Sequence, residues 1–187
     1  DLSLAEAEET AAAITAAGGR AAALAADVSD PAQVACLLDR SIAAFDGIDI
    51  LVNNAGVGKV LAATLDLDDW EAWDRVAAIN VRSVFQCSQR AARWMKDHDG
   101  GKIVNVASRT GVSGVPNINI YGPSKAAVIN MTRSLAVEWA KYRINVNCVA
   151  PIWTRTPRFE TAVERGVVSM EAIQRQCPFG RPAEPEE

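Results

Sequence analysis

Segments with the hydrophobic spacing of helices, about 3.6 residues, alternate along the chain with short apolar runs typical of strands. Residues 3–17 open on a Ser-x-x-Glu capping box and end before a Gly-Gly pair, which predicts a helix. The short apolar run at 21–28 predicts a strand, and an Asp-Pro pair then starts a helix over 31–45. The nearly continuous apolar run at 48–53 predicts a strand that is buried on both faces, as in parallel sheets.

The same alternation continues through the second half of the chain. A long amphipathic stretch covers residues 69–96, a strand follows at 102–107, and a glycine-rich loop leads into a helix over 119–141. A strand at 144–149 completes the pattern, and the proline-rich tail from Cys177 onward indicates a loop. Because a helix separates every strand from the next, the predicted fold class is α/β with a doubly wound parallel sheet.

The length and composition indicate a single domain, 1–187. Hydrophobic residues make up 49% and charged residues 22%, values typical of soluble globular domains. Four predicted strands make a narrow sheet, and no GxGxxG turn opens the chain to hold a pyrophosphate. The chain also opens on Asp rather than Met. We therefore expect a fragment that lacks the first strand, its glycine-rich turn and the last strand.

Charge and special residues exclude several classes of function. The net charge is −4 and the basic residues are scattered, so neither nucleic acid nor an anionic membrane is an expected partner. No apolar run approaches the roughly 20 residues of a membrane helix, and no signal peptide opens the chain, so we expect a cytoplasmic protein. The cysteines form no CxxC pair and His98 has no spaced partner, so no metal is predicted.

The first candidate for chemistry is the pair Tyr121 and Lys125, which stand four residues apart on a predicted helix and so share one face. A phenol is a poor acid or base at neutral pH, but a nearby ammonium favours the phenolate and brings its pKa toward neutrality. Ser108 follows a predicted strand thirteen residues before Tyr121. That is the carboxyl edge of the sheet, where α/β folds bind ligands. These three groups are expected to converge there.

Four motifs in order then carry a family resemblance: Asn53-Asn54-Ala55-Gly56 after a strand, Asn80, Ser108 in Asn-Val-Ala-Ser, and Tyr121-Gly-Pro-Ser-Lys125. In order, spacing and strand context the chain resembles the short-chain dehydrogenase/reductase family over essentially its whole length. The resemblance implies a Rossmann-like fold that binds NAD or NADP.

The resemblance implies four catalytic roles. Tyr121 would be the general acid/base that exchanges a proton with the substrate oxygen, and Ser108 would donate a hydrogen bond to that carbonyl or alkoxide. Lys125 would also bind the nicotinamide ribose hydroxyls. Asn80 would hold a water that links Lys125 to solvent, completing a proton relay.

The same resemblance implies residues on the adenosine side of the cofactor cleft. Asn53, Ala55 and Gly56 would line it, with Gly56 allowing close approach of the backbone. Asp27 and Val28 end the predicted strand at the place where the family contacts the adenine. The Asp of the following Asp-Pro pair is the better helix cap, which leaves the Asp27 carboxylate free.

Cofactor preference depends on Asp1, which stands where the family's second strand ends. A carboxylate there bonds both ribose hydroxyls and repels a 2′-phosphate. No Lys or Arg occurs before Arg20 to accommodate that phosphate. NAD is therefore preferred over NADP.

The nicotinamide side departs from the family in one position. Thr154 would offer its backbone to the carboxamide, and Thr156 matches a family threonine. Family members usually read Pro-Gly where this chain has Pro151-Ile152. The Ile152 side chain must point away from the nicotinamide pocket or reshape it.

The function that the resemblance implies is hydride transfer between NAD(P) and a secondary alcohol or ketone. A nucleotide-sugar epimerase or dehydratase that uses the same dyad is one alternative, and a catalytically silent dinucleotide-binding protein is another. Asn-Asn-Ala-Gly and the segment 135–140 favour the dehydrogenase, and the four catalytic residues oppose a silent protein. A sugar acid, a polyol and a ketoacyl group all remain open as substrates. Relatives pack the helices that carry Asn80 and Tyr121 against further copies, so a homotetramer is expected.

Overall fold

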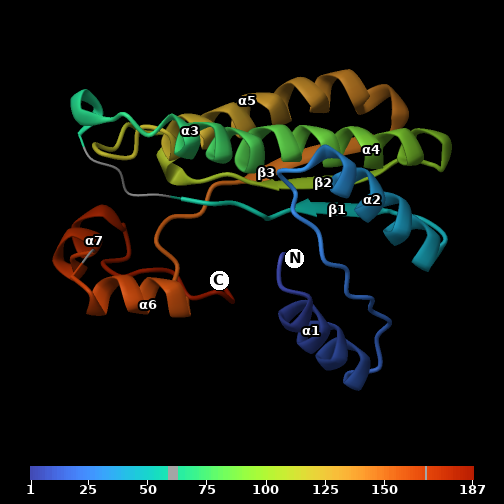
Figure 1. Ribbon diagram of the computed structural model, residues 1–187, viewed down its shortest axis with the longest axis horizontal. Coiled ribbons are helices and arrows are strands. Elements are labelled where there is room, and N and C mark those ends of the chain that lie inside the picture. The colour runs from blue at the N-terminus through green and yellow to red at the C-terminus, as the bar shows by residue number, and fades with distance from the viewer. Residues whose placement is uncertain (59–62, 167) are drawn as a thin grey trace. The chain divides into compact units, whose positions relative to one another are not determined.

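The computed structural model describes residues 1–58, 63–166 and 168–187, and the chain divides into two compact units, Asp1–Val149 and Ala150–Glu187. The first unit contains a parallel sheet and its covering helices, and the second contains two short helices (Figure 1). No helix of the described residues is both long and apolar enough to cross a membrane.

Three parallel strands form the sheet of the first unit in the order β1-β2-β3. They are β1 (Ile50–Asn53), β2 (Gly101–Val106) and β3 (Ile144–Val149). The register aligns the last residue of β1, Asn53, with Asn105 on β2. The predicted parallel α/β fold is therefore confirmed.

Helices cover one face of this sheet. Helix α4 (Ser83–Asp97) packs on β1 and β2, α5 (Tyr121–Trp139) packs on β2 and β3, and α2 (Pro31–Phe45) packs on α4 (Figure 1). The core between these layers includes the fully buried side chains of Met95 on α4 and Ile103 on β2.

Capping residues explain where the helices begin. Ser3 caps α1 (Leu4–Ala16) by accepting the Glu6 N–H, although the Ser3 N–H donates to the Asp1 carboxylate, so only half of the predicted capping box forms. Asp30 caps α2 through the Ala32 and Gln33 N–H groups, as predicted.

The long amphipathic stretch is helical throughout but not uniform. Asp69 caps α3 (Trp70–Ala77), a π-helical turn (Ala78–Arg82) follows, and α4 continues directly from it. Short π turns inside helices are frequent at functional sites. The described residues of the first unit also form 3-10 turns at Thr64–Asp66, Arg109–Gly111 and Ala140–Tyr142.

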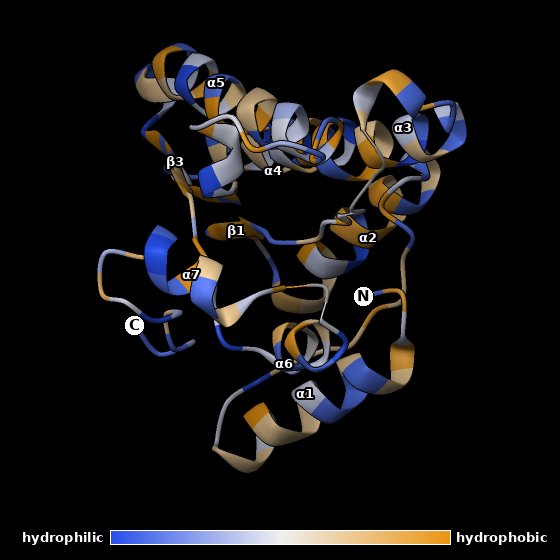
Figure 2. Ribbon diagram, turned by 90° about the vertical axis from the view of Figure 1, so that its left-hand side faces the viewer, coloured by the Kyte–Doolittle hydropathy of each residue, from blue (hydrophilic) through white to orange (hydrophobic). Residues whose placement is uncertain are grey.

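Two predictions about strands are wrong. The apolar run 21–28 is not a strand, because no strand of the described sheet pairs with it. Its long-range backbone bonds are with Asp1: the Asp1 amine donates to the Leu24 carbonyl, and the Ala26 N–H donates to the Asp1 carbonyl. The strand at 48–53 is not buried on both faces, since Ile50 and Val52 are 58% and 57% exposed. Figure 2 shows β1 in the colour of hydrophobic residues. Because consecutive residues of the strand are apolar, the sequence does not distinguish the covered face from the exposed one.

The second unit contains α6 (Pro157–Glu164) and α7 (Met170–Gln176), and the described chain from Cys177 onward has no helix, in line with the predicted loop. Phe159, Ile173 and Cys177 form its buried cluster. Ile152 packs against this cluster and is half-buried. The Ile152 side chain thus has an apolar environment within its own unit.

Candidate active site

Tyr121 is the first residue of α5, and Lys125 lies one turn later on the same face. The Lys125 Nζ is 5.7 Å from the centroid of the Tyr121 ring. The same Nζ donates a 2.8 Å hydrogen bond to the Val106 carbonyl at the end of β2. Lys125 is only 4% exposed, and this burial lowers its pKa below the ordinary lysine value. A buried cation therefore lies beside the phenol ring, as the sequence predicted.

The loop after β1 approaches Tyr121 and Lys125 at two glycines, which have no side chain. A Cβ at Gly56 would lie 3.3 Å from the Lys125 Nζ and 3.5 Å from the Asn80 Oδ1. A Cβ at Gly58 would lie 3.5 Å from the Tyr121 ring. Glycine at these positions lets the loop pass close to the reactive groups, while Ala55 and Gly56 stay exposed.

Asn80 lies in the π-helical turn and is fully buried. Its Oδ1 accepts the Val57 N–H and its Nδ2 donates to the Val57 carbonyl, both at 2.9 Å. The Nδ2 also donates to Ser124 Oγ at 3.0 Å, and Ser124 Oγ donates to the Tyr121 carbonyl at 2.7 Å. The Asn80 side chain therefore ties the loop after β1 to the first turn of α5.

Ser108 follows β2 and begins the 3-10 turn Arg109–Gly111 as its N-cap. This turn lies directly against the backbone of α5. A Cβ at Gly111 would lie 2.6 Å from the Lys125 carbonyl carbon, and a Cβ at Gly122 would lie 3.2 Å from the Thr110 carbonyl oxygen. The fold thus brings the turn that begins at Ser108 against the helix that carries Tyr121 and Lys125.

A buried polar layer lies under this site. Asn53 is 8% exposed, and its Nδ2 donates to Asn105 Oδ1 at 2.8 Å and to Ser88 Oγ at 3.0 Å. Asn105 Nδ2 in turn donates to Thr132 Oγ1 at 2.9 Å. The Asn53 side chain is thus engaged between β1, β2 and α4.

The residues predicted to contact adenine lie just before α2. The Asp27 carboxylate accepts the Ser29 N–H at 2.8 Å, and hydrogen bonds from Ser29 hold the Asp27 pKa below its ordinary value. Val28 is half-buried against the core. Asp30, rather than Asp27, caps α2 as expected, but the Asp27 carboxylate is partly used by the local turn.

The remaining predicted cofactor residues lie at the two ends of the chain. The Asp1 carboxylate is exposed, and its Oδ1 accepts the Ser3 N–H at 3.0 Å. In the second unit the Thr156 hydroxyl caps α6 by accepting the Phe159 N–H, and Thr154 pairs with Ala183 in an isolated parallel bridge.

Comparison with known proteins gives the same assignment as the motifs. The family model described as enoyl-(acyl carrier protein) reductase matches residues 1–187. A 2-dehydro-3-deoxy-D-gluconate 5-dehydrogenase of Dickeya dadantii is 39% identical over 181 residues, which span 96% of this chain and 70% of that protein. A cis-4-hydroxycyclohexanecarboxylate dehydrogenase of Sinomonas cyclohexanicum is 41% identical over 181 residues, covering 97% of this chain and 71% of that one.

Solved structures agree with the sequence relatives. An NAD⁺-bound xylitol dehydrogenase superposes with a TM-score of 0.90 at 29% identity, covering 98% of this chain and 75% of that one. A gluconate 5-dehydrogenase from Burkholderia cenocepacia, in complex with NADP and tartrate, superposes with a TM-score of 0.89 at 30% identity over 98% of this chain and 71% of that one. The chain belongs to the short-chain dehydrogenase/reductase family.

Membership of the short-chain dehydrogenase/reductase family confirms the predicted enzyme class, a dehydrogenase that acts on CH–OH groups. Within this family fold, sequence reasoning missed two hydroxyl groups of the site, Ser124 and Thr110. Ser124 could have been found, because a serine three residues after a helical tyrosine can donate back to its carbonyl. The contacts of Thr110 depend on how the turn after β2 folds back, which no local pattern indicates.

Proposed function

We propose that this chain transfers a hydride reversibly between a nicotinamide dinucleotide and a secondary alcohol or ketone, with Tyr121 as the general acid/base. The observation that carries the proposal is the buried ammonium of Lys125, held 5.7 Å from the Tyr121 ring centroid. A cation in such a place stabilises negative charge on the Tyr121 oxygen, which that oxygen carries whenever its proton is on the substrate.

The chain's own residues then have distinct tasks. In the oxidative direction the substrate hydroxyl gives its proton to Tyr121 Oη, and in the reductive direction Tyr121 returns it to the carbonyl oxygen. Ser108 donates a hydrogen bond to that same oxygen and so fixes its position. Lys125 holds the phenolate and, through water at Asn80, exchanges the proton with solvent. The dinucleotide, when bound, supplies or accepts the hydride.

The exposed loop after β1 supports the proposed position of that dinucleotide. Its expected site lies at the carboxyl end of β1, where Gly56 has no side chain and the backbone is exposed. The residues that would hold it are Asp1, Asp27, Val28, Asn53, Ala55, Gly56, Tyr121, Lys125, Thr154 and Thr156. These two solved relatives bind NAD⁺ and NADP, so the preference for NAD rests on the exposed Asp1 carboxylate and on the lack of a Lys or Arg before Arg20.

The test is turnover by the protein expressed from its complete reading frame. NADH and NADPH consumption would be followed against sugar acids, polyols, cyclic ketones and ketoacyl compounds, with the reverse reaction measured from the alcohols. We expect turnover with at least one of these classes and a preference for NADH. A strong preference for NADPH would contradict the role of Asp1, and conversion of a sugar nucleotide without net change in cofactor would favour the epimerase.

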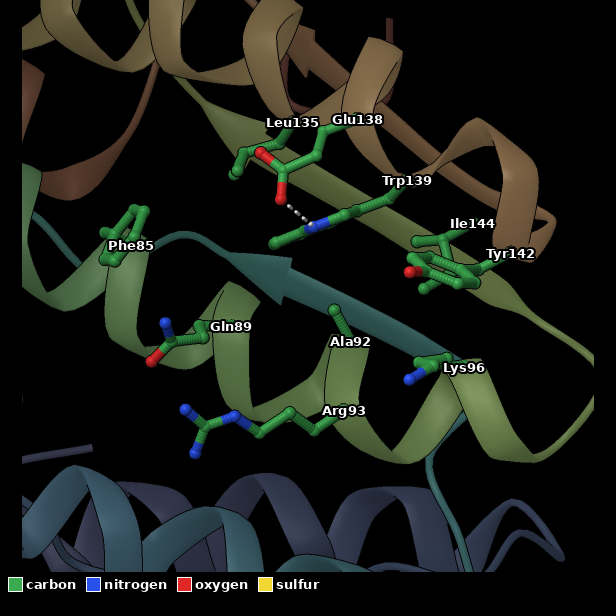
Figure 3. A pocket seen from close by; sticks show the side chains of 10 residues that line it. All are labelled: Phe85, Gln89, Ala92, Arg93, Lys96, Leu135, Glu138, Trp139, Tyr142 and Ile144. Carbon is green, nitrogen blue, oxygen red and sulfur yellow. Dashed lines mark hydrogen bonds between the residues drawn. The ribbon is translucent and has the colours of Figure 1, made fainter.

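We also propose that residues 1–187 belong to one dinucleotide-binding domain, in a cytoplasmic enzyme that assembles as a homotetramer. The single family model that spans both units supports the first point. A hollow of about 180 Å³ between α4 and α5 supports the last (Figure 3). Phe85 lies on its edge at 41% exposure, and Leu135 and Trp139 lie beneath it.

A second copy is the occupant that suits this hollow, because it combines an exposed aromatic ring with charges of both signs, Arg93 and Glu138 (Figure 3). Such a surface can complement itself across a two-fold axis. Phe85→Glu would place a charge in that interface, so we expect the native mass measured by light scattering to fall from that of a tetramer to that of a smaller species. An unchanged mass would contradict this interface.

A further inference from the structure

The hydroxyl of Ser108 is held by one neighbour on both of its acceptor sites. The Thr110 N–H donates to Ser108 Oγ at 3.3 Å, and the Thr110 hydroxyl donates to the same atom at 3.1 Å. Ser108 has extended backbone angles of φ −164° and ψ 155°, and it caps the turn that contains Thr110. The two residues therefore form a closed local arrangement around a single oxygen.

A serine hydroxyl has one proton to donate and two lone pairs to accept with. In this arrangement Thr110 occupies both lone pairs, so the proton is the only hydrogen-bonding capacity that Ser108 has left for a substrate. A hydroxyl that accepts hydrogen bonds is also polarised and becomes a stronger donor. Ser108 is thus committed to donating.

We propose that Thr110 is a positioning residue that fixes Ser108 as a hydrogen-bond donor to the substrate oxygen. The inference rests on the proposed function and deepens it, because it says which way the Ser108 hydroxyl acts. A fixed donor suits a ketone oxygen or an alkoxide, and it cannot take the proton of a bound alcohol. That proton is left to Tyr121 alone.

The packing around Thr110 explains why its hydroxyl can do this. The Thr110 carbonyl oxygen would lie only 3.2 Å from a Cβ at Gly122 on α5. The next residue, Gly111, packs so closely on the Lys125 backbone that a Cβ there would lie 2.6 Å from the Lys125 carbonyl carbon. Thr110 is itself half-buried. A β-branched side chain also has few χ1 rotamers, so little motion remains to be frozen when substrate binds.

A purely structural role for Thr110 makes a different prediction, because the backbone N–H alone suffices to cap the turn. Thr110→Val keeps the shape and the N–H but removes the hydroxyl, whereas Thr110→Ser keeps the hydroxyl and loses a methyl group. Ser113→Ala is a matched control, since it removes another hydroxyl from the same loop, one that contacts Arg109 rather than Ser108.

The experiment measures kcat, KM and the melting temperature of these variants in the full-length enzyme. We expect Thr110→Val to lower kcat about tenfold, the effect of one hydrogen bond lost in the transition state, with the cofactor KM and the melting temperature unchanged. Thr110→Ser should restore most of that loss, and Ser113→Ala should match the parent. In a Ser108→Ala background, Thr110→Val should have no further effect on kcat, because its action passes through Ser108.

Three results would overturn the proposal: an unchanged kcat in Thr110→Val, an equal loss in Thr110→Ser, or the same loss when Ser108 is already alanine. The proposed function fails separately. If Ser108→Ala itself turned over normally, the role of Ser108 in the reaction would be wrong, and the role of Thr110 would be wrong with it. If Ser108→Ala is impaired and Thr110→Val is not, only the inference about Thr110 is wrong.

Discussion

Replacing Tyr121 with phenylalanine is expected to lower kcat about 10³-fold while cofactor affinity stays within about twofold of the parent value. The phenol oxygen is the group that exchanges the substrate proton, and phenylalanine keeps the ring that packs over Gly58. Lys125 keeps its bond to the Val106 carbonyl in the variant, so the site around the missing oxygen should stay in place. The loss should therefore appear in the chemical step.

Stopped-flow turnover and a fluorescence titration with NADH measure the two quantities separately. Tyr142→Phe is the matched control, because the sequence has only two tyrosines and the ring of Tyr142 lies between Lys96 and Lys141, on a different turn. It should turn over like the parent. Near-normal turnover by Tyr121→Phe would contradict the proposed mechanism, whereas equal losses in both variants would mean that a general loss of structure is being measured.

The parts of the fold that the sequence predicted are those with local causes. Asp30 caps a helix because its side chain reaches N–H groups two and three residues ahead, a relation that is visible in the sequence. Tyr121 and Lys125 share a face because helical spacing requires it. The order of strands and helices likewise follows from periodicity, and it was correct for three of the four predicted strands.

The parts that it did not predict depend on distant partners. Residues 21–28 have the apolar pattern of a strand, but a strand also needs a neighbouring strand, and within the described chain the long-range backbone bonds of this run are with Asp1. Ile50 and Val52 are apolar yet exposed, because the pattern of β1 does not say which face is covered. The side-chain contacts of Asn53 were missed for the same reason, since its partner Asn105 is 52 residues away.

Within the candidate site, sequence order identified the reactive groups but not the contacts that hold them. The Ser108, Tyr121 and Lys125 side chains were predicted to converge from their positions at the sheet edge and on one helix face. What brings the two segments together is the absence of side chains at Gly111 and Gly122, where the turn after β2 meets α5. How closely these two backbones approach cannot be read from the sequence. This close approach predicts a large effect of adding a side chain at Gly111.

Substituting alanine for Gly111 should destabilise the protein by about 3 kcal/mol and also impair turnover. The new Cβ would lie 2.6 Å from the Lys125 carbonyl carbon and 2.7 Å from the Ala126 nitrogen, distances that a real Cβ does not tolerate. Both contacts are to backbone, so no side chain can rotate away. Either the turn or α5 has to move, and α5 is held to the sheet by the bond from Asn105 to Thr132.

We therefore expect the turn to lift and to carry Ser108 away from the substrate oxygen, so that kcat falls together with the urea midpoint. Gly114→Ala is the control, because the same loop leaves that position open, with no heavy atom within 4 Å of the added Cβ. Its unfolding free energy should stay within about 0.5 kcal/mol of the parent value. A parental urea midpoint for Gly111→Ala would show that the turn can yield without cost, and the close packing of the turn on α5 would then not be what positions Ser108.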